Sequence, residues 1–199
     1  MAKINSMEGF VHIKTAVASE SPLHIDDSPR LTVAELREKS KKLREEKGIE
    51  VIFVDYLQLL RGPFERSTRQ EEVADVSMEL KSLAKELNIP VVVLSQLSRQ
   101  AEQRRDGRPQ LVDLRESGQI EEIADVVLFI HRPSANKLLL SPEEEGVAEV
   151  IVAKHRHGPT GIGKLAFVKE TAAFRNYTDY LWKREEVEEE PPEDFDLDF

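Results

Sequence analysis

Two apolar segments of strand length end in polar side chains that could bind a metal-bound nucleotide. Asp55 follows VIFV, and Gln96 follows VVVLS. In open α/β sheets, ligands bind in the crevice beyond the carboxyl ends of the strands. A carboxylate there suits Mg²⁺, which takes oxygen ligands and keeps several waters, and a glutamine can orient an attacking water or contact a γ-phosphate. The alternatives are an aspartate that caps the next turn and an ordinary polar residue at a strand end.

Two cations lie at the end of a later apolar strand. Lys154 and Arg156 flank His155, just before His157-Gly158-Pro159. Cations at a strand terminus can reach a phosphate, and an arginine supplied to a neighbouring subunit's nucleotide would be an arginine finger. The alternative is an exposed basic turn. A histidine metal site is disfavoured because no third ligand has suitable spacing.

The segment from Leu97 to Gly118 is long and irregular, and it could contact nucleic acid. Long loops inside compact domains tend to be functional, and arginine side chains and backbone N–H groups commonly bind phosphates. Four acidic residues nearly balance the arginines, so a solvated surface loop is the alternative. The arginines are Arg99, Arg104, Arg105, Arg108 and Arg115.

Two common catalytic motifs are missing. The sequence contains no G-x-S-x-G nucleophile elbow and no G-x-x-x-x-G-K-[ST] phosphate loop. The stretch GPTGIGKL, Gly158 to Leu165, resembles a phosphate loop, but no Ser or Thr follows Lys164. It also lies between two predicted strands, with no helix after it to offer its N-terminus to a phosphate.

Composition favours a single folded domain with an acidic extension. The 199 residues include no cysteine, and no apolar run is long enough to span a bilayer, so we expect no membrane association and a cytoplasmic location. Residues 183–199 carry nine acidic and two basic side chains, and therefore most of the net charge of −10. We predict that 181–199 is a disordered acidic tail and that 1–22 is a poorly defined N-terminal segment.

The elements expected between these ends alternate strands and amphipathic helices, which is typical of an α/β sheet. Thr32 and Glu35 have capping-box spacing, and Gly48 ends the helix that they begin. A second helix is predicted from Gln70 to Leu87, and a short helix near Gln119–Ile123. The predicted strands are 23–26, 49–55, 91–96, 124–131, 147–155 and 163–170, with the last two forming an antiparallel extension.

Several of these motifs together resemble one family. DYLQLL, LSQLSRQ, DLRESGQIEE and VIVAKHRHGPTGIGKLAF occur here in the order found in the C-terminal ATPase domain of DnaB-type replicative DNA helicases. The resemblance covers roughly Ser21 to Tyr177. It implies a RecA-like, mostly parallel sheet flanked by helices, truncated at its N-terminal side, with antiparallel strands at its C-terminal end. Residues 23–180 would form this partial domain.

The resemblance also implies roles for the nucleotide-site residues. Asp55 is similar to the Walker B aspartate that supports Mg²⁺, and Gln96 to the residue that senses the γ-phosphate of ATP. Arg156 resembles the arginine finger that is directed at the adjacent subunit's nucleotide, with Lys154 as its companion.

The DNA contacts and partners follow from the same resemblance. Arg115, Glu116 and Gly118 fall in the family's DNA-contacting loop. The family works as a homohexameric ring with single-stranded DNA in its channel, so the implied partners are ssDNA, other helicase subunits or the missing N-terminal half, a primase and a helicase loader.

The departure from the family pattern sets the expected activity. The family's Walker A loop and catalytic glutamate precede the strand equivalent to Leu23–Asp26, and residues 1–22 contain neither. We therefore predict that the chain is part of an ATP-dependent helicase but is inactive alone. The alternative is a non-catalytic ring-assembly or DNA-binding module derived from that helicase.

Overall fold

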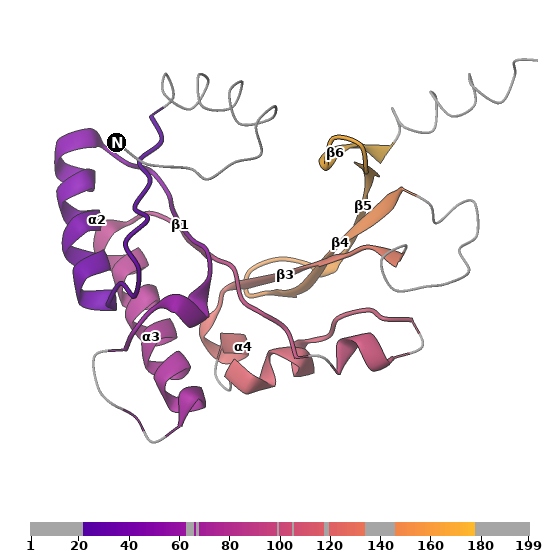
Figure 1. The fold of residues 1–199 in the computed structure, drawn as a ribbon, viewed down its shortest axis with the longest axis horizontal. Helices are drawn as coiled ribbons and strands as arrows, with labels where there is room; N and C mark the ends of the chain where they lie inside the picture. The colour runs from indigo at the N-terminus through magenta and orange to yellow at the C-terminus, as the bar shows by residue number, and fades with distance from the viewer. Residues whose placement is uncertain are drawn as a thin grey trace, which may run out of the picture. The chain divides into compact units, whose positions relative to one another are not determined.

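The computed structural model describes residues 22–62, 66, 68–98, 100–104, 106–117, 120–133 and 146–177 (Figure 1). The predicted N-terminal segment up to residue 21 and the predicted tail at 181–199 lie outside these residues. Contacts divide the chain into two units, Met1–Arg30 and Leu31–Phe199. In the described part of the chain, no helix is long and apolar enough to cross a membrane.

The predicted strand at Leu23–Asp26 is wrong. The described residues of the first unit contain no strand, and the side chains of Leu23 and Ile25 are 56% and 72% exposed. A strand depends on hydrogen bonds to a neighbour, and residues 23–26 form no backbone–backbone hydrogen bond with another described residue. The residues after this segment form a turn, in which Asp26 Oδ1 accepts a hydrogen bond from the backbone N–H of Ser28 at 3.0 Å.

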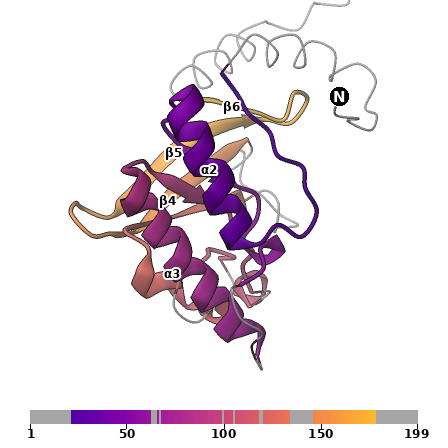
Figure 2. The same cartoon turned by 90° about the vertical axis from the view of Figure 1, so that its left-hand side faces the viewer.

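Two helices cover one face of a parallel strand pair. Helix α2 spans Val33–Lys47 and begins with the predicted capping box, in which Glu35 N donates to Thr32 Oγ1 at 3.2 Å. It ends at Gly48, whose φ of 67° is the left-handed conformation that glycine adopts without strain. Helix α3 spans Arg69–Leu87 and starts from a second capping box at Thr68. Figures 1 and 2 show the two helices side by side.

Strands β1 (Ile52–Val54) and β2 (Val91–Val93) pair in parallel, with Val54 opposite Val93. Buried side chains from α2, the two strands and α3 form one core, namely Val33, Ile52, Val54, Leu57, Leu60, Val73, Val76, Leu80, Leu83 and Ile89. The opposite face is exposed, with Phe53 at 67%, Val92 at 43% and Leu94 at 49%.

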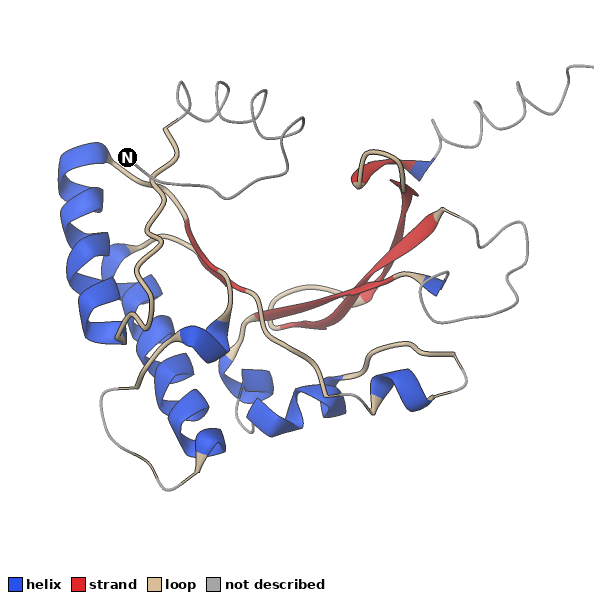
Figure 3. Cartoon of the chain, viewed as in Figure 1, coloured by secondary structure: helices blue, strands red, loops and turns tan. Residues whose placement is uncertain are grey.

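The remaining strands form a four-stranded antiparallel sheet in the order β3-β4-β5-β6 (Figure 3). They span Val126–His131, Val147–His155, Gly161–Val168 and Ala173–Asn176. The predicted antiparallel extension is confirmed, and it is larger than expected because β3 also pairs antiparallel with β4. A second core of Leu114, Val127 and Phe129 lies beneath this sheet.

Short helices connect the two sheets. A 3-10 turn, η1, spans Leu57–Leu59 directly after β1. The long segment after β2 contains η2 (Ala101–Gln103) and η3 (Leu111–Ser117), and α4 (Ile120–Ile123) leads into β3. Together, these elements confirm the predicted α/β class.

Candidate functional site

Asp55 and Gln96 lie beyond the same edge of the parallel pair. The backbone pairing continues past β1 and β2, since Leu94 N donates to Val54 O at 2.9 Å and Leu57 N donates to Leu94 O at 2.8 Å. Val54 is paired with Val93, so the next residues, Asp55 and Leu94, lie beside each other just beyond the two strands. Gln96 follows Leu94 by two residues. The side chains of Asp55 and Gln96 are both exposed. The parallel pairing thus places the two strand ends next to each other, whereas the roles of the two residues stay predictions.

Gln58 links these strand ends, and the sequence reasoning missed it. Its Nε2 donates to Ser95 Oγ at 3.2 Å, and its Oε1 accepts from Gln96 N at 3.4 Å. Its backbone carbonyl accepts from Arg69 Nη2 at the start of α3. The available signal was an amide inside the otherwise apolar LQLL, a place where a buried polar group needs partners.

Lys154 and Arg156 lie at the end of β4 and already have partners within the chain. Lys154 Nζ donates to the carbonyl oxygens of Glu121 and Glu122, the latter at 3.2 Å. Arg156 Nη1 donates to Asp125 Oδ1 at 3.1 Å, and Arg156 N donates to Asp125 O at 2.8 Å. The side chain of Arg156 is nevertheless exposed in the turn that follows β4, and the phosphate role of these two cations stays a prediction.

Asp125 is a second residue that the sequence reasoning missed. Besides Arg156, it pairs with Lys81 of α3. The hydrogen bond from Lys81 is the main cause that lowers the pKa of the Asp125 carboxyl, and the charges of Lys81, Arg156 and His157 act in the same direction. Asp125 is thus the carboxylate that pairs with Lys81 and Arg156 and interacts with the charge of His157.

Two of the five loop arginines serve the fold. Arg104 binds both carboxylate oxygens of Asp113 at 2.6 Å each, and Arg108 binds both oxygens of Glu149 at 3.0 and 2.7 Å. Asp113 and Glu149 are buried. A buried carboxylate needs a cationic partner, so Arg104 and Arg108 have a structural role, and phosphate binding by this segment stays a prediction.

The other loop residues are described only in part. Arg115 and Glu116 belong to η3, and their side chains lie outside the described residues, as do Gly118, Arg99 and Arg105. The predicted DNA contacts of Arg115, Glu116 and Gly118 stay predictions. Ser98 N donates to Asp113 O at 3.0 Å, so the buried aspartate ties the start of this segment to η3.

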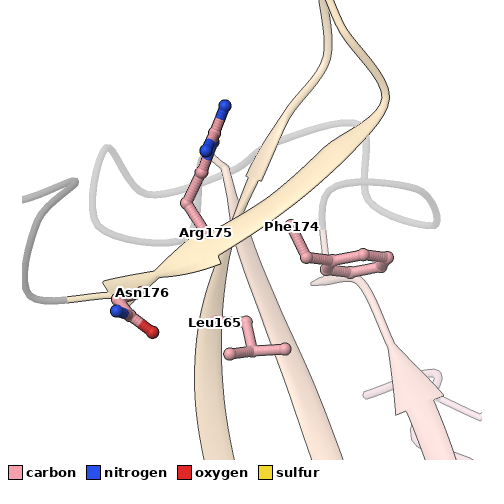
Figure 4. Close-up of a pocket in the computed structure, with 4 residues that line it drawn as sticks. All are labelled: Leu165, Phe174, Arg175 and Asn176. Carbon is pink, nitrogen blue, oxygen red and sulfur yellow. The ribbon is translucent and has the colours of Figure 1, made fainter. Parts of the chain in front are cut away.

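Two further features do not add to the site. Within the described ranges, no group of three or more His, Cys, Asp or Glu side chains could hold a metal ion. A hollow of about 320 Å³ is lined by Leu165, Phe174, Arg175 and Asn176 of β5 and β6 (Figure 4). It contains none of the predicted site residues.

Comparisons with known proteins agree on one family. The family model of the DnaB-like helicase C-terminal domain matches residues 2–176. The replicative DNA helicase DnaC of Bacillus subtilis is 47% identical over 159 residues, which are 79% of this chain and 35% of that protein. The replicative DNA helicase DnaB of Geobacillus stearothermophilus is 46% identical over 160 residues, with the same shares. The chain thus spans about a third of the length of these relatives.

Solved structures give the same picture. One of them, the structure of an ATPase domain, superposes with a TM-score of 0.77 at 40% identity, over 83% of this chain and 58% of that one. A DnaB-like replicative helicase, solved in a study of its interactions with primase, also has a TM-score of 0.77, at 39% identity over 83% and 41% of the two chains. The RecA-like architecture expected from the sequence is confirmed by these neighbours.

Proposed function

The chain belongs to the DnaB-like helicase C-terminal domain family, and on this premise we propose that it is part of the ATP-dependent motor of a replicative DNA helicase. The motor would be a hexameric ring that unwinds duplex DNA while it moves along ssDNA. The observation that carries this proposal is the parallel pairing of β1 and β2, which brings Asp55 and Gln96 to one edge.

At this edge we assign Asp55 to Mg²⁺ and Gln96 to the γ-phosphate of ATP. An exposed carboxylate at a strand end fits Mg²⁺, because this ion is usually held by one or two carboxylates together with waters and phosphate oxygens. When bound, the ion would neutralise phosphate charge. Gln58 fixes the backbone of Gln96 through the 3.4 Å hydrogen bond, which limits how far the sensing side chain can move.

The remaining assignments concern neighbouring subunits and DNA. Arg156 and Lys154, at the end of β4, would act on the nucleotide of the adjacent subunit. Arg115, Glu116 and Gly118 would contact the ssDNA backbone, where contacts are mostly to phosphates. A primase and a helicase loader are candidate partners of the assembled ring.

The exposed face of β1 and β2 supports the proposal that ATP turnover needs an additional polypeptide to cover this face. Parallel strands are normally covered on both faces, and here Phe53, Val92 and Leu94 are exposed. We assign this face to the polypeptide that carries the phosphate loop, and we expect no ATP turnover from the chain without it.

A chimeric ring tests the proposal. Residues 22–177 replace the matched segment of the Bacillus subtilis relative, and ssDNA-stimulated ATP turnover is measured. Asp55→Asn should reduce kcat by about 10²-fold or more, because charge stabilisation at the transferring phosphoryl is lost. The matched control is Glu50→Gln, an exposed carboxylate just before the amino end of the same strand, which should leave turnover unchanged.

Two outcomes would contradict this function. Full turnover in Asp55→Asn would remove that residue from the nucleotide site. Strong Mg²⁺-dependent turnover by the separate chain would refute its dependence on added polypeptide. A chimera that forms rings and binds ssDNA but never hydrolyses ATP would favour the second function, a non-catalytic ring-assembly or DNA-binding module.

A further inference from the structure

We propose that Asp125 is a positioning residue, which orients Arg156 toward the neighbouring subunit's phosphates and connects it to the DNA-contacting loop. The inference rests on the function proposed above and assigns a role to a residue that lies in neither predicted site. It is carried by three contacts, which meet at the junction between α4 and β3.

The first contact fixes the main chain and the side chain of Arg156 together. Arg156 N donates to Asp125 O at 2.8 Å, and Arg156 Nη1 donates to Asp125 Oδ1 at 3.1 Å. The first bond fixes the backbone of Arg156, and the second anchors its side chain at one point. Both reduce conformational freedom before a ligand arrives, which is the basis of pre-organisation. The Nε and Nη2 groups of Arg156 make no hydrogen bond to any described residue, so they are available to bind phosphate.

The second contact, from Lys81, holds the Asp125 carboxylate through the oxygen that Arg156 does not use. Lys81 of α3 pairs with Asp125 Oδ2, the other carboxylate oxygen. Arg156 is 47% exposed and Asp125 is 50% exposed, so water screens their attraction. Asp125 can therefore orient the guanidinium while leaving it able to contact a phosphate.

The third contact joins this group to the loop that is predicted to bind DNA. In the sequence, residues 115–118 come shortly before α4, Ile120–Ile123. The carbonyl oxygens of Glu121 and Glu122 accept hydrogen bonds from Lys154 Nζ, and Asp125 follows two residues after α4. On this inference, a displacement of the loop by DNA would reach the carbonyl oxygens that hold Lys154 and, two residues after α4, the carboxylate that holds Arg156.

The first test follows Arg156 itself in the full chain. In Asp125→Asn, the Arg156 side chain should become more mobile, measured as a lower ¹⁵N order parameter of its Nε. Asp125→Glu should restore part of the order. The matched control is Glu79→Gln, which removes the 2.6 Å ion pair of Arg37 between α2 and α3 and should leave Arg156 unchanged. Unchanged Arg156 order in Asp125→Asn would overturn the inference.

The second test uses turnover of the chimeric ring. Asp125→Asn should lower kcat by about 10-fold with little change in KM, because misplacing a reacting group costs rate. It should also reduce the stimulation by ssDNA. The double variant with Arg156→Ala should be no slower than Arg156→Ala alone, since Asp125 acts through Arg156. Additive losses would instead mean a general structural role and would overturn the inference.

The two tests separate the possible failures. If the wild-type chimera shows no ssDNA-stimulated turnover, the proposed function fails, while the Arg156 order parameter still decides whether Asp125 positions that side chain. If turnover is present and Asp125→Asn leaves both kcat and Arg156 order unchanged, only the positioning role fails.

Discussion

Asp113 is buried at 1% exposure, and both of its carboxylate oxygens are occupied. Arg104 donates to each oxygen at 2.6 Å, and Gln110 N donates to one of them at 2.7 Å. The hydrogen bonds from Arg104 are the main cause that lowers the pKa of Asp113, despite the opposing effect of burial. Because the Asp113 carboxylate accepts all of these hydrogen bonds, a neutral side chain at this position would leave Arg104 without its charged acceptor.

We therefore predict a pH-dependent cost for Asp113→Asn. At pH 7 the substitution should lower the free energy of unfolding by about 2–3 kcal/mol, measured by urea denaturation. The folded-state pKa of Asp113 lies below the unfolded value of 3.8. Its contribution is therefore fully present above about pH 4 and is lost as the pH falls through the folded-state pKa.

The difference in free energy of unfolding between the wild-type chain and the variant should thus shrink as the pH falls below about 4. Glu79→Gln, which removes a more exposed ion pair, should cost less than about 1 kcal/mol. A constant difference between wild type and Asp113→Asn from pH 7 to pH 3 would show that the charge of Asp113 is not the source of the stability.

At the scale of elements, the N-terminus of α3 is linked to the edge of the parallel pair where Asp55 and Gln96 lie. Thr68 Oγ1 accepts from Glu71 N at 3.2 Å, and Thr68 N donates to Glu71 Oε2 at 3.3 Å. Arg69, the first helical residue, donates to the carbonyl of Gln58. The start of this helix therefore supports the amide that holds Gln96.

We predict that Thr68→Ala lowers the free energy of unfolding by about 1 kcal/mol, the usual cost of losing an N-cap. Hydrogen exchange should also accelerate at the first turn of α3 and at the Gln96 amide. Thr32→Ala is the matched control, because it removes the equivalent cap of α2. It should cost a similar free energy and leave the Gln96 amide unchanged; equal acceleration at Gln96 in both variants would contradict the connection.

The sequence predicted the limits of an element well where neighbouring residues in the chain determine them. The cap at Thr32 and the left-handed Gly48 lie within or beside the helix they bound, so α2 has its predicted limits. The end of β1 could be predicted to within one residue because its apolar run ends at Asp55, whereas β2 ends at Val93, three residues before the predicted end at Gln96. The strand at Leu23–Asp26 could not be judged in this way, since its formation depends on a partner strand and not on its own residues.

Contacts between distant residues account for what the sequence reasoning missed. Asp125 and Arg156 are 31 positions apart and meet only because β3 and β4 pair antiparallel. Arg108 and Glu149 are 41 positions apart. A loop with nearly balanced charges looks like a solvated surface until its partners are known, so the buried pairs at Asp113 and Glu149 gave no sequence signal.

At the scale of the whole molecule, the parallel pair leaves one apolar face uncovered in the described residues. Phe53 is 67% exposed, and Val92 and Leu94 lie on the same face. Burying apolar surface is favourable by about 25 cal/mol per Å². Covering these side chains would therefore make the free energy of association with a partner more favourable. The proposed function assigns this partner to the polypeptide that carries the phosphate loop.

Phe53→Glu should impair association with the second polypeptide while leaving the stability of the separate chain nearly unchanged. Because Phe53 is exposed, the substitution should change the free energy of unfolding of the separate chain by less than about 1 kcal/mol. It should abolish association with the polypeptide that carries the phosphate loop, measured by analytical ultracentrifugation, because a charge would be buried without a partner. Met78→Glu, at a 48% exposed position on α3, is the matched control and should associate normally. Normal association of Phe53→Glu would mean that this face of β1 and β2 is not where the two polypeptides meet.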